Sequence, residues 1–411
     1  MCIRDRLSLD LDLERVGQRA LGGPLNPGNN PGAFVALDPR TGELLALGSN
    51  PTFDPALLTK PITQKQYELL VDEAQGAPIF NRAISSAYPT GSTFKAVTAL
   101  AGLHAGLITP GATIHDPGCI TVGEAERCNA KDQAYGSVDL TRALQVSSDV
   151  YFYKLGINTF YSRGHDFAIQ QWARKLGFDR PTGVDLPGEF GGLIPDPKWR
   201  DEIRKTELDC RKKKKISSQA NVYAAAAAGC GISDMREYNL GDTVNLTVGQ
   251  GDLQATPLQL AVAYGAIANG GKVVRPHLGL EIESDRGELV QRIERDPARR
   301  IKIDPAHLAA VTNGLHLAAS APGGTSADVF AGWPQDRYPV YGKTGTAERG
   351  LKRDQSWYVA YVPDKKRPIV VAVTVEEGGF GAEVAAPIAR LLLSEYYDQA
   401  KVVVQGSSQT R

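Results

Sequence analysis

Two kinds of hydrophobic pattern alternate along the chain. Near its start, Leu9, Leu13, Val16 and Ala20 recur at helical spacing, which predicts a helix that begins after Ser8 as its N-cap. Gly, Pro and Asn residues at 22–32 end this helix. Short apolar runs at 33–37 and 43–47 flank a loop that contains Pro and Gly, and they predict a strand hairpin.

The middle of the chain has a mostly helical pattern, and strands return near the end. Helical periodicity is clearest at 97–103, 140–155 and 258–267, whereas 340–343, 356–362 and 369–375 are short runs rich in β-branched or aromatic residues. Residues 385–396 predict a last amphipathic helix. We therefore expect an α/β (α+β) fold, in which both ends of the chain build an antiparallel five-stranded sheet flanked by helices, with an inserted all-helical subdomain at about 97–265.

The composition is that of a folded, globular protein without a dominant charge. The 411 residues are 42% hydrophobic and 22% charged, and 46 Lys and Arg residues balance 46 Asp and Glu residues. No overall field draws the chain to nucleic acid, and we expect no nucleic-acid partner. The one charge run, at 211–215, is interpreted as a solvated loop between two cysteines rather than as a nucleic-acid contact.

The two ends of the chain carry little structural signal. We find no run of eighteen apolar residues and no signal-peptide pattern. Residues 1–6 are polar and without pattern, and we interpret them as a non-native scar outside the fold. The folded domain is then expected to span 7–403, followed by a disordered tail at 404–411.

Four of the five cysteines form two local pairs along the sequence. Cys119 and Cys128 are separated by a Gly-containing polar stretch, and a longer stretch separates Cys210 from Cys230. We expect two disulfides, which persist in an oxidising, extracytoplasmic compartment. The alternatives are free structural thiols, or a zinc site that adds a neighbouring His and Asp, although the spacing fits no standard zinc pattern. We expect no metal and no cofactor.

A serine and a lysine three residues apart follow a turn that contains Pro and Gly. Ser92 should lie at the start of an apolar helix, where backbone N–H groups favour developing negative charge. Lys95 falls on the same helical face and is a candidate base if it is neutral, which burial and a second cation such as Lys343 would favour. Roughly one such match arises by chance in a chain of this length, so the motif alone is not decisive.

Two further polar motifs follow in order. Lys-Thr-Gly-Thr at 343–346 ends a predicted edge strand, to which a substrate peptide could pair as an additional strand. Gly345 would let the backbone of this peptide approach closely. The ammonium group of the lysine and the threonine hydroxyl groups would bind the carboxylate of the peptide. Ser-Ser-Asp at 147–149 lies in or beside the helix predicted at 140–155, and it enters a cleft only if the backbone is irregular there. Alone it is a surface polar cluster, but the ordered set of three motifs indicates acyl-serine chemistry.

The ordered motifs resemble the signature of β-lactamases and penicillin-binding proteins. The stretches at 249–251, 256–260, 269–271 and 342–348 make the resemblance more specific. Over roughly 7–400 the chain is similar to the transpeptidase domain of class B penicillin-binding proteins, of the penicillin-binding protein 2 (elongation) type. The resemblance implies the penicillin-binding/β-lactamase-like serine transferase fold and D,D-transpeptidation of peptidoglycan stem peptides.

The resemblance also implies how acylation occurs. Ser92 attacks the carbonyl of a terminal D-Ala-D-Ala while Lys95 accepts its proton, and the backbone N–H groups of Ser92 and Thr346 form the oxyanion hole. An amine of a second stem peptide then takes the acyl group. β-Lactams acylate Ser92 covalently.

The leaving group has its own implied residues. Ser147 relays a proton to the departing D-alanine, and Lys343, Thr344 and Thr346, around Gly345, hold the carboxylate of that D-alanine.

One motif position departs from the family pattern, because Asp149 stands where most relatives carry Asn. An ionised Asp only accepts hydrogen bonds, so it would bind Lys95 and hold it charged. We prefer the interpretation that Asp149 contacts the substrate amide, or contacts Lys95 in one protonation state only, because elongation-type members resemble this variant.

Hydrolytic and sensory alternatives use the same serine. A β-lactamase needs a Glu followed four residues later by Asn, yet Glu207 is followed at that spacing by Arg211, and Glu189 and Glu202 are followed by Leu and Thr. Deacylation by water should therefore be slow, which favours transpeptidation over D,D-carboxypeptidase or β-lactamase activity. A β-lactam-sensing receptor domain is the third alternative, against which the stretch 249–271 argues.

The family further implies a cellular setting. Its members carry an N-terminal transmembrane helix and a pedestal domain, neither of which we find in these residues. They face outward from the bacterial cell membrane and work with a membrane glycan polymerase of the elongation machinery. We expect the same localisation and partner for this protein.

Overall fold

The centre of the fold is a five-stranded antiparallel sheet in a computed structural model that describes residues 3–164, 167–350, 352–404 and 406. The order β12-β13-β14-β2-β3 joins strands from both ends of the chain, which confirms the predicted sheet. The strands are β2 (Gly32–Leu37), β3 (Leu44–Asn50), β12 (Tyr341–Arg349), β13 (Lys352–Val362) and β14 (Ile369–Val375). β12 pairs only with β13 and is therefore an edge strand, as predicted.

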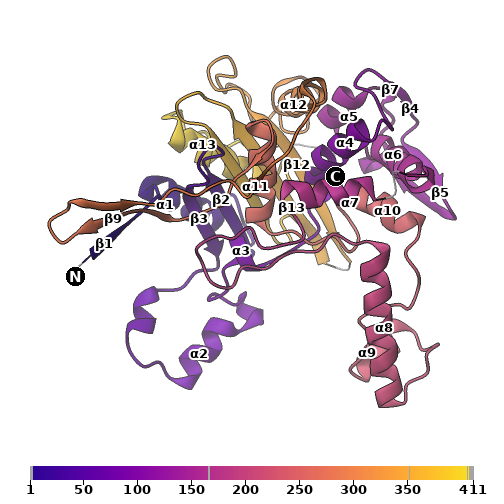
Figure 1. Cartoon of the computed structure of the whole chain (residues 1–411), viewed down its shortest axis with the longest axis horizontal. Coiled ribbons are helices and arrows are strands. Elements are labelled where there is room, and N and C mark those ends of the chain that lie inside the picture. The colour runs from indigo at the N-terminus through magenta and orange to yellow at the C-terminus, as the bar shows by residue number, and fades with distance from the viewer. Residues whose placement is uncertain (1–2, 165–166, 351, 405, 407–411) are drawn as a thin grey trace.

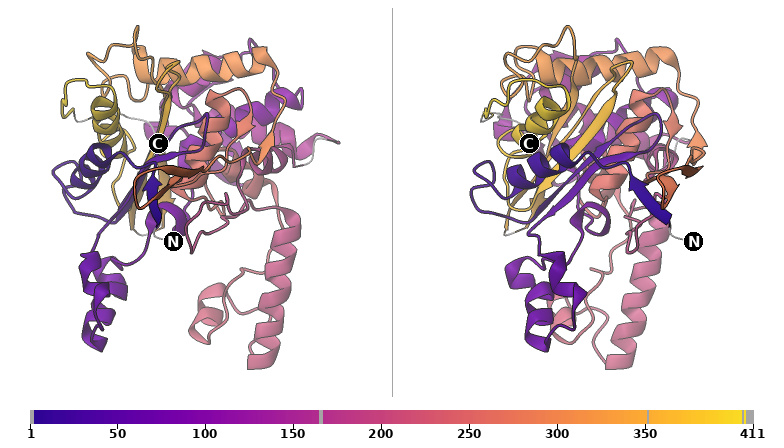
Figure 2. Two further views of the ribbon diagram at one scale, coloured as in Figure 1. Left: turned by 60° about the vertical axis from the view of Figure 1, so that its left-hand side comes forward. Right: turned by 90° about the vertical axis from the view of Figure 1, so that its left-hand side faces the viewer.

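Helices cover both faces of this sheet, as Figure 2 shows. One face packs on α1 (Leu11–Leu21) and α13 (Ala385–Tyr396), and the other on α3 (Arg82–Ser85) and α11 (Pro257–Ala268). All seven residues of β14 are buried because the strand lies between these two layers. The predicted N-cap of the first helix is wrong: Asp10 caps α1, while the Ser8 hydroxyl donates to the carbonyl of Leu44 at 2.7 Å.

The inserted subdomain is not all-helical, which corrects the prediction. Two small antiparallel pairs lie within it because the polar stretch between the helices forms hairpins: β4 (Ile114–Asp116) pairs with β7 (Gly136–Val138), and β5 (Cys119–Val122) pairs with β6 (Ala125–Cys128). The helical elements are η3 (Gly91–Phe94), α4 (Lys95–His104), η4 (Ala130–Asp132), α5 (Leu140–Val146), α6 (Asp149–Tyr161), α7 (Ala168–Leu176) and α10 (Leu240–Thr247). An unpredicted helix, α12 (Pro305–Ser320), packs on α5 and β12.

Two projections leave the body of the molecule on the same side (Figures 1 and 2). One contains η1 (Pro55–Thr59), α2 (Gln64–Val71) and η2 (Glu73–Gln75), and the other is an arm of α8 (Pro197–Lys214) and α9 (Val222–Ala227). The charge run at 211–215 ends α8, so the predicted loop is wrong, although its four lysines are exposed to solvent as expected. Arg211 is buried because it pairs with Glu207 one turn earlier, at 2.5 Å.

The remaining strands lie at the edges of the fold. β1 (Ile3–Leu7) pairs with β9 (Gly279–Ser284), and β10 (Leu289–Arg292) pairs with β9 on its other side. Residues 3–6 are therefore part of the fold, and the interpretation that places 1–6 outside it is wrong for these four residues. β8 (Lys272–Val273) pairs with β11 (Arg299–Arg300). Of the expected tail at 404–411, positions 405 and 407–411 lie outside the described residues, and so do residues 1–2. None of the helices in the described ranges combines the length and apolarity that crossing a bilayer requires.

Candidate active site

Ser92 and Lys95 lie where the chain enters its first helix of the subdomain. Ser92 belongs to η3, Lys95 begins α4, and both side chains are buried. Gly91 has a φ of 55°, and a Cβ atom there would lie 2.4 Å from the carbonyl oxygen of Thr346 on β12. The glycine therefore allows the serine turn to lie directly against the edge strand.

The Lys95 ammonium group joins the first predicted motif to the second. Its Nζ atom donates to the carbonyl oxygen of Ser147 at 2.7 Å and to the Ser147 hydroxyl at 3.1 Å. It also lies 2.7 Å from an oxygen of Asp149. The structure thus brings the first two motifs into direct contact, through a side chain with no exposed surface.

A break between two helices makes this contact possible. The predicted helix 140–155 is divided at Ser147, whose φ of 61° is left-handed and ends α5. Ser148 then caps α6 through a 3.0 Å bond from the N–H of Tyr151 to its hydroxyl. The irregular backbone that the sequence analysis required is therefore present.

The third motif lies within β12 rather than at its end. Lys343, Thr344 and Thr346 are buried, and the Thr344 hydroxyl donates to that of Thr325 at 2.9 Å. Gly345 has a role within the protein, because a Cβ atom at this position would lie 2.5 Å from the carbonyl oxygen of Thr90. The glycine accommodates the protein's own serine turn.

The two lysines share a buried environment. Burial lowers the pKa of Lys95 below that of a free lysine, and the Asp149 carboxylate opposes this shift. Burial, and secondly repulsion from Lys95, lower the pKa of Lys343 well below its ordinary value. The second-cation effect predicted for Lys95 therefore acts on Lys343, while burial is the main cause at Lys95.

A cleft of about 300 Å³ opens beside Ser92, Asp149 and Thr346. Gln250, in the turn at 249–251 that contributes to the family resemblance, also lines the cleft, although no role was predicted for it. Its amide donates to the carbonyl oxygen of Thr346 at 3.1 Å and accepts from the N–H of Glu348 at 3.2 Å. Gln250 thus fixes the backbone of the edge strand at the cleft. A larger cavity of about 920 Å³ beside α2 contains none of the motif residues.

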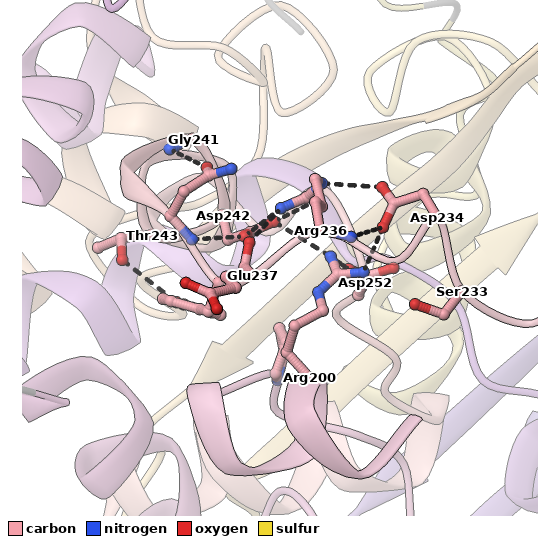
Figure 3. Close-up of polar contacts among 12 residues, drawn as sticks. Arg200, Ser233, Asp234, Arg236, Glu237, Gly241, Asp242, Thr243 and Asp252 are labelled. Carbon is pink, nitrogen blue, oxygen red and sulfur yellow. Dashed lines mark hydrogen bonds and ion pairs between the residues drawn. The ribbon is translucent and has the colours of Figure 1, made fainter. Parts of the chain in front are cut away.

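An ion-pair network next to this turn links it to the base of the α8 arm (Figure 3). Arg200 of α8 donates to Asp252 at 2.6 Å and to Asp242 at 3.3 Å, and Arg236 binds the other oxygen of Asp242 at 2.5 Å. Asp252 follows Gly251, which lines the cleft. The arm is therefore tied to the segment that carries Gln250.

Both cysteine pairs are bonded. One disulfide joins Cys119 to Cys128 across the β5–β6 hairpin, and the other joins Cys210 on α8 to Cys230. Glu126 lies near the first pair, but sulfurs in a disulfide are not available as thiolate ligands, which removes the zinc alternative there. Glu207 accepts from the N–H groups of Gly231 and Ile232 in the arm, and is not among the residues that line the cleft.

A Ser-x-x-Lys pair, a second lysine on a sheet edge and a hydroxyl between them define the group of active-serine proteins that includes β-lactamases and penicillin-binding proteins. The family model described as penicillin binding protein transpeptidase domain matches residues 32–394. The chain belongs to this family, as the resemblance predicted.

The curated relatives that the chain matches are named as peptidoglycan D,D-transpeptidases. The chain is 31% identical over 413 residues to the peptidoglycan D,D-transpeptidase MrdA of Haemophilus influenzae, and the match covers 96% of this chain and 56% of the relative. The chain thus spans about half the length of the curated relatives that it matches.

Solved structures agree in fold over nearly the whole chain. Penicillin-binding protein 2 of Pseudomonas aeruginosa, in complex with WCK 5153, is 31% identical with a TM-score of 0.76, covering 98% of this chain and 80% of its own. A structure of a peptidoglycan synthase complex, which concerns the coordination of polymerization and crosslinking, has 29% identity and a TM-score of 0.77. The match covers 97% of this chain and 64% of that one. Penicillin-binding protein A of M. tuberculosis, as a ceftriaxone acyl-enzyme, has 26% identity and a TM-score of 0.74, covering 95% and 79%.

Proposed function

We propose that this protein is a serine D,D-transpeptidase that crosslinks peptidoglycan stem peptides through an acyl-serine intermediate. The observation that carries the proposal is the position of Lys95, which lies three residues after Ser92 and contacts both Ser147 and Asp149. From this position the one buried amine can accept the proton of Ser92 and can pass a proton through Ser147 to the leaving group. The relative named as a D,D-transpeptidase and the acyl-enzyme structure of a family member support the same chemistry.

Acylation begins at Ser92. Neutral Lys95 takes the hydroxyl proton as the serine oxygen attacks the carbonyl carbon of the penultimate D-alanine, and the N–H groups of Ser92 and Thr346 stabilise the oxyanion. Burial favours the neutral form of Lys95. Gln250 contributes by holding the Thr346 carbonyl, and thereby the backbone that presents the second N–H group.

Departure of D-alanine requires a proton at its nitrogen. The Ser147 hydroxyl is bonded to Lys95 and relays that proton. Lys343 and the hydroxyl groups of Thr344 and Thr346 hold the carboxylate of the leaving D-alanine, with Thr325 orienting Thr344. The amine of a second stem peptide then attacks the acyl-enzyme carbonyl and releases Ser92.

Transfer to an amine is favoured over hydrolysis. Glu207, the candidate deacylation base in this region, is bonded to Arg211 and to two backbone N–H groups within the α8 arm, so it does not activate water at Ser92. The acyl-enzyme should therefore persist until an amine arrives. By the same chemistry, β-lactams acylate Ser92 and remain bound.

The cellular setting is part of the proposal. The family resemblance and the similar structure of a peptidoglycan synthase complex support a membrane glycan polymerase as partner. We place the domain on the extracytoplasmic face of the bacterial membrane, where its two disulfides are stable.

The test uses a fluorescent penicillin and a stem peptide. Wild-type protein and a Ser394→Ala control, which changes a buried serine of α13, should form a stable covalent adduct, while Ser92→Ala should form none. With a D-Ala-D-Ala peptide and an amine acceptor, mass spectrometry should detect the crosslinked product. Absence of an adduct, or equal labelling of Ser92→Ala, would contradict the proposal, and release of D-alanine without crosslinking would favour a carboxypeptidase.

A further inference from the structure

The β5–β6 hairpin forms a wall of the cleft and is closed by the Cys119–Cys128 disulfide. Residue 129 follows this disulfide directly in the chain. Its backbone N–H donates to the carbonyl of Gly118 at 2.8 Å, so the residues on either side of the bridged hairpin are held together. Figure 1 shows this hairpin beside α6.

The Asn129 side chain connects the hairpin to the start of α6. Its oxygen accepts from the N–H groups of Asp149 at 2.7 Å and Val150 at 3.0 Å. Its amide nitrogen donates to both oxygens of Asp116 at 2.9 and 3.0 Å, and to the carbonyl of Gln133 at 2.7 Å. With 4% of its surface exposed, Asn129 has its hydrogen-bonding capacity used within the protein.

Asp116 also connects Asn129 to the second motif. It is fully buried, and it accepts from the N–H of Gly118 at 2.9 Å and from the Ser148 hydroxyl at 2.5 Å. Ser148 is the residue between Ser147 and Asp149. Each residue of the second motif therefore either contacts Lys95 or is held by the pair Asp116 and Asn129.

We propose that Asn129 is a positioning residue for acyl transfer, and that the Cys119–Cys128 disulfide keeps it in place. This inference rests on the proposed function. Asn129 does not touch Lys95 or Ser92; it fixes the first turn of α6, so that Asp149 and Ser147 remain within hydrogen-bonding distance of Lys95. Opening the disulfide frees the β5–β6 hairpin that ends at Asn129, and the contacts at Lys95 loosen with it.

The effect should be visible in the pH dependence of acylation. The charged groups that face Lys95 are Asp149 of α6, Asp116 of β4 and Lys343 of β12, and Tyr135 faces both carboxylates. If Asp149 moves away, the carboxylate that favours charged Lys95 is lost, and the rising limb of the rate profile moves to lower pH. A general loss of folded protein would lower the amplitude without moving the limb.

The experiment measures penicillin acylation rate constants from pH 5 to pH 10 for wild type, Asn129→Leu and the double variant Cys119→Ser/Cys128→Ser. The double variant Cys210→Ser/Cys230→Ser is the matched control, because it removes the other disulfide, in the α8 arm. We expect the first two variants to acylate about 10- to 100-fold more slowly at their optimum, with the limb at lower pH, and the control to match wild type. The pair Asn129→Asp/Asp116→Asn, which restores a donor facing an acceptor, should recover part of the rate.

The outcomes separate this inference from the proposed function. If wild type forms no adduct, the proposed function fails. If wild type is acylated but Asn129→Leu and the Cys119/Cys128 variant have its rate and its pH limb, the positioning role is wrong. It is also wrong if these variants are slower only in proportion to the folded fraction, measured by thermal unfolding, with the limb unmoved.

Discussion

The ion pair between Lys95 and Asp149 makes a quantitative prediction for Asp149→Asn. The two charged atoms are 2.7 Å apart, and Lys95 is fully buried. An opposite charge at this distance favours the charged form of a lysine and therefore raises its pKa. Asn removes this contribution and leaves burial, which lowers the pKa of Lys95.

The sign of the effect follows from the role of Lys95 as a base. Acylation needs the neutral amine, so the rate rises with pH through the pKa of Lys95. Asp149→Asn should therefore move the rising limb to lower pH, and the variant should keep a larger fraction of its optimum rate at pH 6 than wild type does.

Stopped-flow fluorescence with a labelled penicillin, between pH 5 and pH 10, measures the limb. Asp38→Asn is a matched control, since Asp38 is also a buried carboxylate in an ion pair, 2.7 Å from Arg40, on the turn after β2. Its limb should coincide with that of wild type. A limb for Asp149→Asn at the wild-type pH or above it would refute the assignment of Lys95 as the base that Asp149 holds charged.

Three other substitutions test separate parts of the site and the arm. Lys343→Ala removes a charged hydrogen bond to the substrate carboxylate and should lower the second-order acylation constant about 10- to 100-fold, whereas a penicillin ester without this carboxylate should lose little. Gln250→Ala frees the Thr346 carbonyl and should slow acylation about tenfold with little change in penicillin affinity, measured by separating the two in saturation kinetics. Arg211→Met leaves Glu207 buried and unpaired, which should destabilise the α8 arm by about 3 to 5 kcal/mol in hydrogen exchange while penicillin acylation stays at the wild-type rate.

The sheet could be predicted from the sequence because its pattern is local. β14 is a run of apolar and β-branched residues between two turns, and β12 and β13 show the β-branched and aromatic residues typical of strands. The helices α8 and α12 also carry a local sequence signal, because in each an Asp N-cap precedes a Pro at the first helical position. This signal indicates a helix that leads into the charge run at 211–215.

The parts of the site that escaped prediction depend on distant contacts. Ser147 adopts a left-handed conformation without the Gly or Asn that usually marks one, so the end of α5 has no local sequence signal. Asn129 lies twenty residues before the backbone that it binds, and Gln250 lies ninety-six residues before Thr346. The motif residues were found because their chemical types and order are specific, whereas these supporting residues are defined only by the folded geometry.

The buried position of Lys343 links ligand binding to protons. Burial and the nearby Lys95 hold its pKa well below that of a free lysine even though the Asp149 carboxylate opposes the shift, and a ligand carboxylate placed at Nζ raises that pKa again. Binding of an anionic ligand is then accompanied by proton uptake from solvent, since the charged form of the lysine gains a partner. The calorimetric enthalpy of binding should therefore vary with the ionisation enthalpy of the buffer. The site would then bind its anionic ligand and the proton that charges Lys343 together.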